Sequence, residues 1–213
     1  MKELNELREA VQKGKTKLVK QLVPEALQAG IPPQDILNQG LLAAMDVVGT
    51  RFRANEIFVP EVLVAARAMN AGVELLKPHL TSEEGQAKGK VCIGTVQGDL
   101  HDIGKNLVKM MLEGKGLEVI DLGVDVPPER FVQTAIEQDC NIICCSALLT
   151  TTMPVMEEVV RAADAAGIRP KVKIMIGGAP VTQAFCDTIG ADAYTPDAAT
   201  CAIRAVELID GSE

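Results

Sequence analysis

The chain has 213 residues, 47% hydrophobic and 23% charged, and a formal net charge of −8. That charge would repel phosphate backbones, and one tyrosine without tryptophan offers few surfaces for base stacking, so we expect no nucleic-acid partner. No apolar run approaches the roughly 20 residues of a membrane-spanning helix, and the first residues lack a signal-like apolar stretch. We therefore expect a cytoplasmic protein without a membrane partner.

The first part of the chain has apolar residues at helical spacing. Two helices are predicted around Leu4 to Val11 and Leu18 to Leu27, with Pro24 expected to kink or interrupt the second because it lacks an amide donor. A third helix is expected from Pro33 to Gly49, and Pro60 opens a fourth that ends at 77–78. Residues 1–80 are thus predicted to form an antiparallel four-helix bundle.

The rhythm changes after residues 78–89, which hold few core-forming side chains. We expect a linker at 81–89 between domains 1–80 and 90–213. Beyond it, short β-branched runs alternate with helical stretches, and apolar residues at successive positions indicate strands buried on both faces. The predicted fold is α/β: a helical bundle followed by a Rossmann-like (flavodoxin-like), doubly wound, parallel five-stranded sheet, with strands at 91–96, 117–122, 141–146, 172–176 and 191–195. Ligands of such sheets bind at the carboxyl ends of the strands.

A loop with a histidine between acidic residues follows the first predicted strand, in the segment Gly98-Asp99-Leu100-His101-Asp102-Ile103-Gly104. It matches neither the dinucleotide fingerprint nor the phosphate-binding loop. A neutral imidazole is a good ligand for a transition metal, and a carboxylate such as Asp99 can hold its other nitrogen. Asp99 alone would equally suit a helix cap.

The metal ligands available to the chain are few. There are two histidines, and His79 lies in the linker-like segment, so a site with several imidazoles is excluded. The six cysteines show no zinc-ligand spacing and are interpreted as small buried hydrophobes. A single histidine ligand suffices only for a metal that arrives already chelated, as in a tetrapyrrole-like cofactor.

The pattern Asp99-x-His101-x-x-Gly104, then Ser146-x-Leu148, then Gly177-Gly178 resembles the cobalamin-binding domains of the methionine synthase type. Residues 49–52 and 56–60 resemble the helical cap of the same family. The whole chain is similar to the corrinoid proteins of methanol and methylamine methyltransferase systems.

This resemblance implies roles for individual residues. His101 would coordinate the cobalt of cobalamin from below, with the cofactor's own base displaced, and Asp99 and Thr152 would complete an axial relay with no catalytic residue acting alone. The cofactor-binding set would be Gly98, Asp99, His101, Asp102, Ile103, Gly104, Ser146, Leu148, Thr150, Thr152, Gly177, Gly178, Tyr194, Asp197 and Ala198, with Phe52 and Val59 covering the methyl-bearing face. The slot for the displaced nucleotide tail would be lined by Gly104, Ser146, Leu148, Thr150, Gly177 and Gly178. Without the resemblance, Phe52 and Val59 are bundle core and residues 150–152 a solvated helix start.

The function implied is a carrier that takes a methyl group on cobalt from a substrate-specific methyltransferase to a second methyltransferase that uses tetrahydrofolate or a thiol. A reductive activase would be a third partner, and the carrier is not expected to be an enzyme alone. The alternatives are the small cobalamin-binding subunit of an adenosylcobalamin mutase and a cobalamin-dependent sensor. The sequence does not identify the methyl donor.

Overall fold

A computed structural model describes residues 2–80 and 87–211 of the chain. It divides into two compact units, residues 1–86 with the turn 114–116, and residues 87–113 with 117–213. Most of the predicted linker, residues 81–86, lies outside the described residues. In the part of the chain that is described, no helix is long and apolar enough to cross a bilayer.

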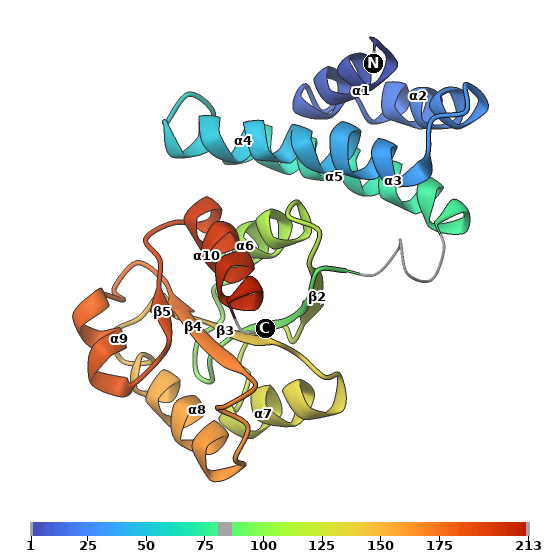
Figure 1. Ribbon diagram of the computed structural model, residues 1–213. Coiled ribbons are helices and arrows are strands. Elements are labelled where there is room, and N and C mark those ends of the chain that lie inside the picture. Colours follow the sequence, from blue (N-terminus) through green and yellow to red (C-terminus); the bar gives the residue numbers. More distant parts are fainter. Residues whose placement is uncertain (1, 81–86, 212–213) are drawn as a thin grey trace. The chain divides into compact units, whose positions relative to one another are not determined.

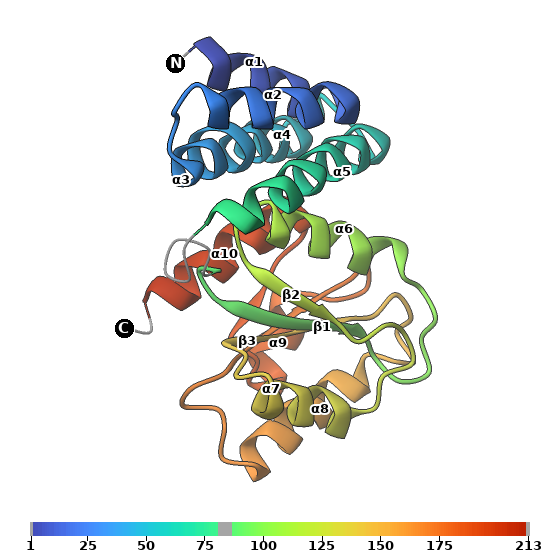
Figure 2. The same ribbon diagram turned by 90° about the vertical axis from the view of Figure 1, so that its right-hand side faces the viewer.

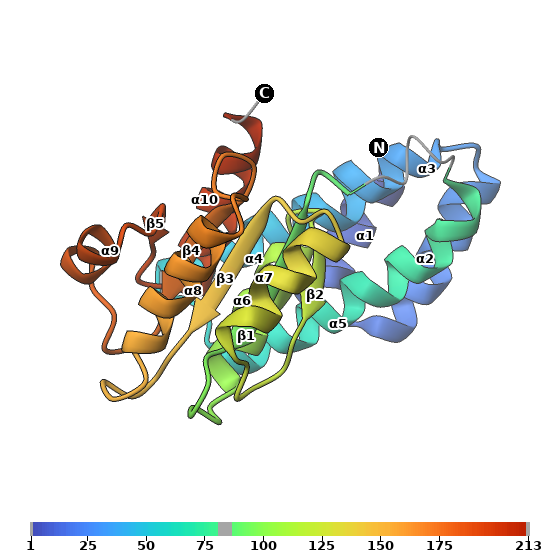
Figure 3. The ribbon, with the colours of Figure 1, turned by 90° about the horizontal axis from the view of Figure 1, so that it is seen from below.

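The first unit is built from helices whose apolar faces meet in one core. Leu7, Val19, Ile36, Leu41 and Met69 are all buried there. Helices α2 and α5 lie side by side (Figure 3). The elements are α1 (Lys2–Gln12), α2 (Thr16–Gln28), α3 (Pro33–Asp35), the π-helical η1 (Ile36–Leu42), α4 (Ala43–Arg53), α5 (Val59–Leu76) and the 3-10 helix η2 (Lys77–His79).

Two expected helix breaks do not occur in this unit. Helix α2 continues through Pro24, because Val19, Val23 and Ala26 pack into the core and offset the one hydrogen bond that proline removes. The third helical segment passes Gly49, which is buried, and α4 ends at Arg53. The left-handed backbone of Asn55, with φ of 57°, follows that end, and asparagine tolerates this conformation.

The second unit contains a five-stranded sheet in the order β2-β1-β3-β4-β5, and every pair is parallel. Its strands are β1 (Lys90–Thr95), β2 (Glu118–Asp121), β3 (Ile142–Ser146), β4 (Lys173–Gly177) and β5 (Ala193–Tyr194). The five predicted strands are all present, although β5 is reduced to two residues. This is the flavodoxin-like strand order, in which the order of successive strands reverses between β1 and β3. The predicted fold class is confirmed.

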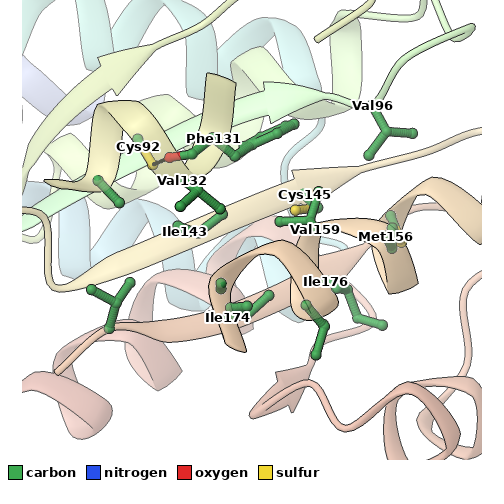
Figure 4. Packing of buried hydrophobic residues seen from close by; sticks show 14 of the residues in the cluster. Cys92, Val96, Phe131, Val132, Ile143, Cys145, Met156, Val159, Ile174 and Ile176 are labelled. Carbon is green, nitrogen blue, oxygen red and sulfur yellow. Dashed lines mark hydrogen bonds between the residues drawn. The ribbon is translucent and has the colours of Figure 1, made fainter. Parts of the chain in front are cut away.

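Helices cover both faces of the sheet (Figures 1 and 2). Helices α6 (Ile103–Glu113) and α10 (Ala198–Asp210) pack together on one face. The other face carries α7 (Pro128–Glu137), α8 (Pro154–Ala165) and α9 (Gln183–Ile189), which pack on the strands in an apolar core. In Figure 4, Phe131 and Val132 of α7 and Met156 and Val159 of α8 lie around side chains of the strands, among them Cys145.

The cysteines follow this layering. All six are unpaired and buried, which confirms their interpretation as small core residues. Successive side chains of a strand point to opposite faces. Cys145 therefore belongs to the core under α7 and α8, whereas its neighbour Cys144 lies on the face covered by α6 and α10.

Candidate functional site

Two loops meet at the point where the strand order reverses, between β1 and β3. One follows β1 and carries residues 96–102, and the other follows β3 and carries residues 147–153. Because β1 and β3 are paired in register, with Thr95 opposite Ser146, their loops emerge side by side. The amide of Val96 donates to the carbonyl oxygen of Ser146 at 3.0 Å. Open α/β sheets bind ligands at this position.

The imidazole of His101 is held by Asp99. Asp99 Oδ1 lies 2.6 Å from His101 Nδ1 and 3.0 Å from the His101 amide nitrogen. The carboxylate is fully buried, whereas 51% of the His101 side chain is exposed. Because an ionised carboxylate only accepts hydrogen bonds, Nδ1 carries a proton, and in the neutral imidazole Nε2 is then the nitrogen with a free electron pair. This is the arrangement of a histidine prepared to bind a metal.

Asp99 is ionised because many donors surround it. Its Oδ2 accepts the amides of Leu148 at 2.7 Å and Leu149 at 3.2 Å. Burial alone would raise the pKa of Asp99, but the hydrogen bonds from the Leu148 and His101 amides and from the His101 and Thr152 side chains hold it well below its usual range. None of these donors is an amide of helix α6, so Asp99 does not cap that helix, and this alternative was wrong.

Thr152 joins the two loops. Its hydroxyl lies 3.0 Å from Asp99 Oδ2 and 2.9 Å from the carbonyl oxygen of Leu149. Both neighbours only accept, so the single hydroxyl proton is shared between them. The side chain is buried, which excludes a solvated helix start at this residue. Thr152 is therefore part of one hydrogen-bonded group with Asp99 and His101.

A cavity of about 330 Å³ opens at the carboxyl ends of the strands, between the sheet and helices α6 and α10. Of the residues predicted to contact the cofactor, those in its lining are Gly104, Ser146, Gly177, Gly178, Tyr194, Asp197 and Ala198. Most of the lining is apolar. The cavity is large enough for a compact ring system but lies near the lower limit for small-molecule sites, roughly 300 to 1,000 Å³.

Gly178 is required by the backbone around the cavity. Its φ is +135°, and a Cβ atom there would lie 1.8 Å from the carbonyl oxygen of Ala147. Gly104 has a different reason, since a Cβ atom at this residue would meet nothing within 4 Å and would point into open space. Gly178 thus allows the chain to pass close to Ala147, and Gly104 leaves space in the cavity that a side chain would occupy.

Two predicted slot residues do not line the cavity. Leu148 and Thr150 are exposed in the loop after β3. The contribution of Leu148 to the site is its backbone amide, which binds Asp99. In the loop after β1, the Asp102 side chain accepts a hydrogen bond from Asn106 at 3.1 Å, and Ile103 is 74% exposed. Together with Leu100, which is 71% exposed, Ile103 places apolar surface beside His101.

Several functional candidates were missed from the sequence, foremost Lys105. Its side chain is 3% exposed and lines the cavity, while its Nζ lies 2.6 Å from Asp121 Oδ1 and 2.7 Å from Asn106 Oδ1. Burial would raise the pKa of Asp121, but the hydrogen bonds from Lys105 and the Gly123 amide lower it. The other missed lining residues are Ile93, Leu107, Val108, Cys144, Cys145, Met175, Ile176, Ala179, Thr195, Pro196 and Cys201. Some of these residues could have been predicted, because side chains two positions apart in a strand point to the same face. Cys144 lies two positions before Ser146 and therefore shares its face.

The two candidates in the helical unit are half-buried. Phe52 lies in the last turn of α4, and Val59 is the first residue of α5. Between them Ile57 is buried and Phe58 is 65% exposed, so this corner of the bundle presents apolar surface.

Comparisons with known proteins agree with this geometry. Two family models, each described as a B12 binding domain, match residues 89–205 and residues 3–77. Dimethylamine corrinoid protein 3 of Methanosarcina acetivorans is 42% identical over 206 residues, which cover 97% of this chain and 96% of that protein. Trimethylamine corrinoid protein 1 of Methanosarcina mazei is 46% identical over 179 residues, 83% of each chain. A chain of the methanol:cobalamin methyltransferase complex MtaBC from Methanosarcina barkeri superposes with a TM-score of 0.90 at 31% identity, covering 99% of this chain and 80% of that one.

A parallel sheet of this order, with an imidazole backed by a buried carboxylate where the strand order reverses, defines a protein of the cobalamin-binding class. The chain belongs to the family of B12-binding domains, and within it resembles the corrinoid proteins. The resemblance inferred from the sequence and the predicted cofactor class are confirmed.

Proposed function

We propose that this protein carries a methyl group on the cobalt of a bound corrinoid, between one methyltransferase that loads it and another that unloads it. The observation that carries this proposal is the 2.6 Å contact between the buried carboxylate of Asp99 and Nδ1 of the half-exposed His101. This contact supports the assignment of Nε2 as the proposed metal ligand at the binding edge of the sheet. When bound, the corrin supplies the cobalt centre that accepts and releases the methyl group.

The residues present fit such a cofactor. A cavity of about 330 Å³ is too small for a corrin macrocycle but suits a nucleotide tail. The macrocycle would therefore rest outside the cavity, against His101 and the apolar side chains of Leu100 and Ile103. We propose that the macrocycle also contacts residues of the same two loops, namely Gly98, Asp102, Leu148 and Thr150.

Asp99 and Thr152 would control the proton on the ligand. Because the pKa of Asp99 is held well below its usual range, a proton added to this pair would reside on Nε2 of His101 and not on the carboxylate. Asp99 would remain ionised and stabilise the resulting charge through Nδ1. Thr152 would act as a positioning residue, since it touches Asp99 and not the ligand atom.

The donor and the partners follow from the relatives. Those of 42% and 46% identity are named for dimethylamine and trimethylamine. We therefore propose a methylated amine as donor and a methyltransferase specific for it as the loading partner. The unloading methyltransferase, with tetrahydrofolate or a thiol as acceptor, and a reductive activase complete the proposed set, and the carrier would not act as an enzyme alone.

We propose that residues 90–213 bind the cofactor, that residues 1–80 form a cap, and that residues 81–89 are the linker. Phe52 and Val59 would cover the methyl-bearing face. The presence of the cap argues against the small subunit of a mutase, which usually lacks it. The cytoplasmic location stays a prediction.

The test is electron paramagnetic resonance of the cobalt(II) form of the protein reconstituted with cobalamin. Histidine labelled with nitrogen-15 should change the superhyperfine pattern of the wild type. The His101→Ala variant should lose the histidine coupling, whereas His79→Ala, which alters the other histidine, should retain it. Both variants should fold like the wild type, because both side chains are exposed. Circular dichroism checks this.

An unchanged pattern in the labelled wild type would contradict histidine ligation. Retention of the coupling in His101→Ala would contradict the assignment of the ligand. The donor is tested separately, by incubating the reduced protein with trimethylamine or dimethylamine methyltransferase and its amine. Methylation with methanol and its methyltransferase but with neither amine would reject the proposed donor class.

A further inference from the structure

We infer that the cavity selects cobamides whose lower base is a benzimidazole and disfavours those with a purine base. This inference rests on the proposed function, because it concerns the displaced tail of the same cofactor. It is carried by the chemistry of the inner wall of the cavity, which differs from the chemistry of its mouth.

The inner wall is a row of three side chains on adjacent strands. Ile93 of β1 is in register with Cys144 of β3, and Cys144 is in register with Met175 of β4. All three line the cavity, and each is at most 4% exposed. This row contains hydrocarbon and sulfur but no oxygen or nitrogen in its side chains.

The next row toward the mouth is different. Ser146 lies opposite Gly177, at the ends of β3 and β4, and both line the cavity. The glycines leave backbone groups accessible at this level. A ribose or a phosphate can therefore be solvated or hydrogen-bonded near the mouth, while a base that enters further meets the apolar row.

The helical wall adds little polarity at the inner level. Leu107 and Val108 of α6 and Cys201 of α10 line the cavity one turn inside their helices. The hydrogen bond between Cys144 and Cys201, together with burial, raises the pKa of the Cys144 thiol well above its usual range, so this thiol is neutral. The wall therefore offers weak thiol groups that already interact with one another.

The charged residues of the lining already have hydrogen-bond partners within the protein. The Lys105 ammonium binds Asp121 and Asn106. The Asp197 carboxylate caps helix α10, with contacts of 2.8 Å to the Thr200 amide and 2.7 Å to its hydroxyl. The hydroxyls that remain belong to Ser146, Tyr194 and Thr195, which lie at strand ends.

The two classes of base differ in what they need from such a wall. The outer ring of dimethylbenzimidazole carries methyl groups and no heteroatom, whereas the six-membered ring of adenine carries an amino group and ring nitrogens. A polar atom buried without a partner costs free energy comparable to a lost hydrogen bond. One or two unmet groups predict an affinity lower by about tenfold or more for the purine form.

The experiment measures the affinity of the cofactor-free full chain for cobalamin, adeninylcobamide and cobinamide. Each is titrated with protein, and binding is followed by the change in corrin absorbance. Cobinamide, which lacks the nucleotide tail, reports binding of the macrocycle alone. We expect cobalamin to bind at least about tenfold more tightly than adeninylcobamide. Met175→Gln, which is nearly isosteric and adds an amide to the inner row, should reduce this ratio by about threefold or more.

Cys144→Ser is a second variant of the same row, with Cys92→Ser as its matched control. Cys92 is equally buried, but it belongs to the core under α7 and α8 and does not line the cavity. The cost of releasing each base from cobalt is the same for every variant, so it cancels when the affinity ratios of variant and wild type are compared. Cys144→Ser should lower the ratio, and Cys92→Ser should leave it unchanged.

Equal affinity of wild type for the two cobamides would overturn the inference, as would ratios that neither Met175→Gln nor Cys144→Ser changes. These results would leave the proposed function intact, because cobalamin would still bind. Failure of both cobamides and of cobinamide to bind would overturn the proposed function and this inference with it.

Discussion

Asp99 and Thr152 are 53 positions apart in the sequence, and their side chains meet at 3.0 Å in the folded chain. Each follows a strand, Asp99 after β1 and Thr152 after β3, and these two strands pair directly. The group that holds the imidazole is therefore assembled from two strand ends. Its geometry depends on the register of the sheet.

Replacing Asp99 with asparagine should lower the free energy of unfolding by about 1 to 3 kcal/mol. The NH2 group of asparagine would take the place of an oxygen that accepts hydrogen bonds, and it cannot accept them. The pKa of Asp99 is lower in the folded state than the value of 3.8 for a free carboxyl. Its ionised form therefore contributes stability that is present above about pH 4 and is lost as the pH falls toward the folded pKa. Urea denaturation at a series of acidic pH values should show a shallower slope for Asp99→Asn than for wild type.

The control for this pH dependence is Asp102→Asn, which changes an exposed carboxylate in the same loop. It should keep the slope of the wild type. An acid-dependence of Asp99→Asn equal to that of wild type would show that another carboxyl group is responsible.

Replacing Thr152 with valine should cost about 0.5 to 1.5 kcal/mol, the usual value for one hydrogen bond. The cost should stay modest because Asp99 keeps the amides of His101, Leu148 and Leu149 and the imidazole of His101. Thr152→Ser should retain most of the stability, since its hydroxyl can reach the same carboxylate. A positioning role is measured by nitrogen-15 NMR of the imidazole, whose Nδ1 signal, which reports the hydrogen bond to Asp99, should change in Thr152→Val and return in Thr152→Ser. Identical Nδ1 signals in all three proteins would reduce Thr152 to a structural residue.

A phenylalanine at Gly104 should close the cavity without disturbing the fold, because a Cβ atom there meets nothing within 4 Å. The affinity for cobalamin should fall to that for cobinamide, while the affinity for cobinamide stays near that of wild type. Gly104→Ala adds a side chain too small to block the cavity and serves as control. Undiminished cobalamin binding by Gly104→Phe would place the nucleotide tail elsewhere.

The glycine pair at the end of β4 makes a prediction about stability. Gly178→Ala should lower the free energy of unfolding by about 3 kcal/mol or more, because the new methyl group would clash with Ala147 and the backbone is left-handed. At Gly177 the nearest atom to an added Cβ is the Thr195 carbonyl oxygen at 3.7 Å, an ordinary contact. Gly177→Ala should therefore cost less than about 1 kcal/mol, a small value for one substitution. Thermal unfolding of the two variants compares them directly, and equal melting temperatures would contradict the clash.

The sheet could be predicted from the sequence because its signals are local. Each buried strand is a short run of β-branched residues between turns, and the observed strand Ile142–Ser146 lies within the predicted 141–146. The helix boundaries were less accurate. Pro24 and Gly49 have strong local preferences, but packing of their neighbours in the bundle outweighs those preferences.

The site was predicted where its residues are adjacent in the sequence, as in Asp99 and His101. It was incomplete where the partners come from distant segments. The ion pair between Lys105 and Asp121 joins a helix to the end of an edge strand, and no local pattern marks it. The Leu148 amide binds Asp99 through its backbone, so the identity of the side chain carries no information about this contact.

The opposite orientation of Cys144 and Cys145 separates two tasks within one strand. Variation at every second position can remodel the surface offered to a ligand while the intervening side chains continue to hold the layers together. A library of apolar residues of similar size at 93, 144 and 175 would therefore explore new cofactor preferences, whereas the same library at 92, 143 and 174 would alter only the packing under α7 and α8.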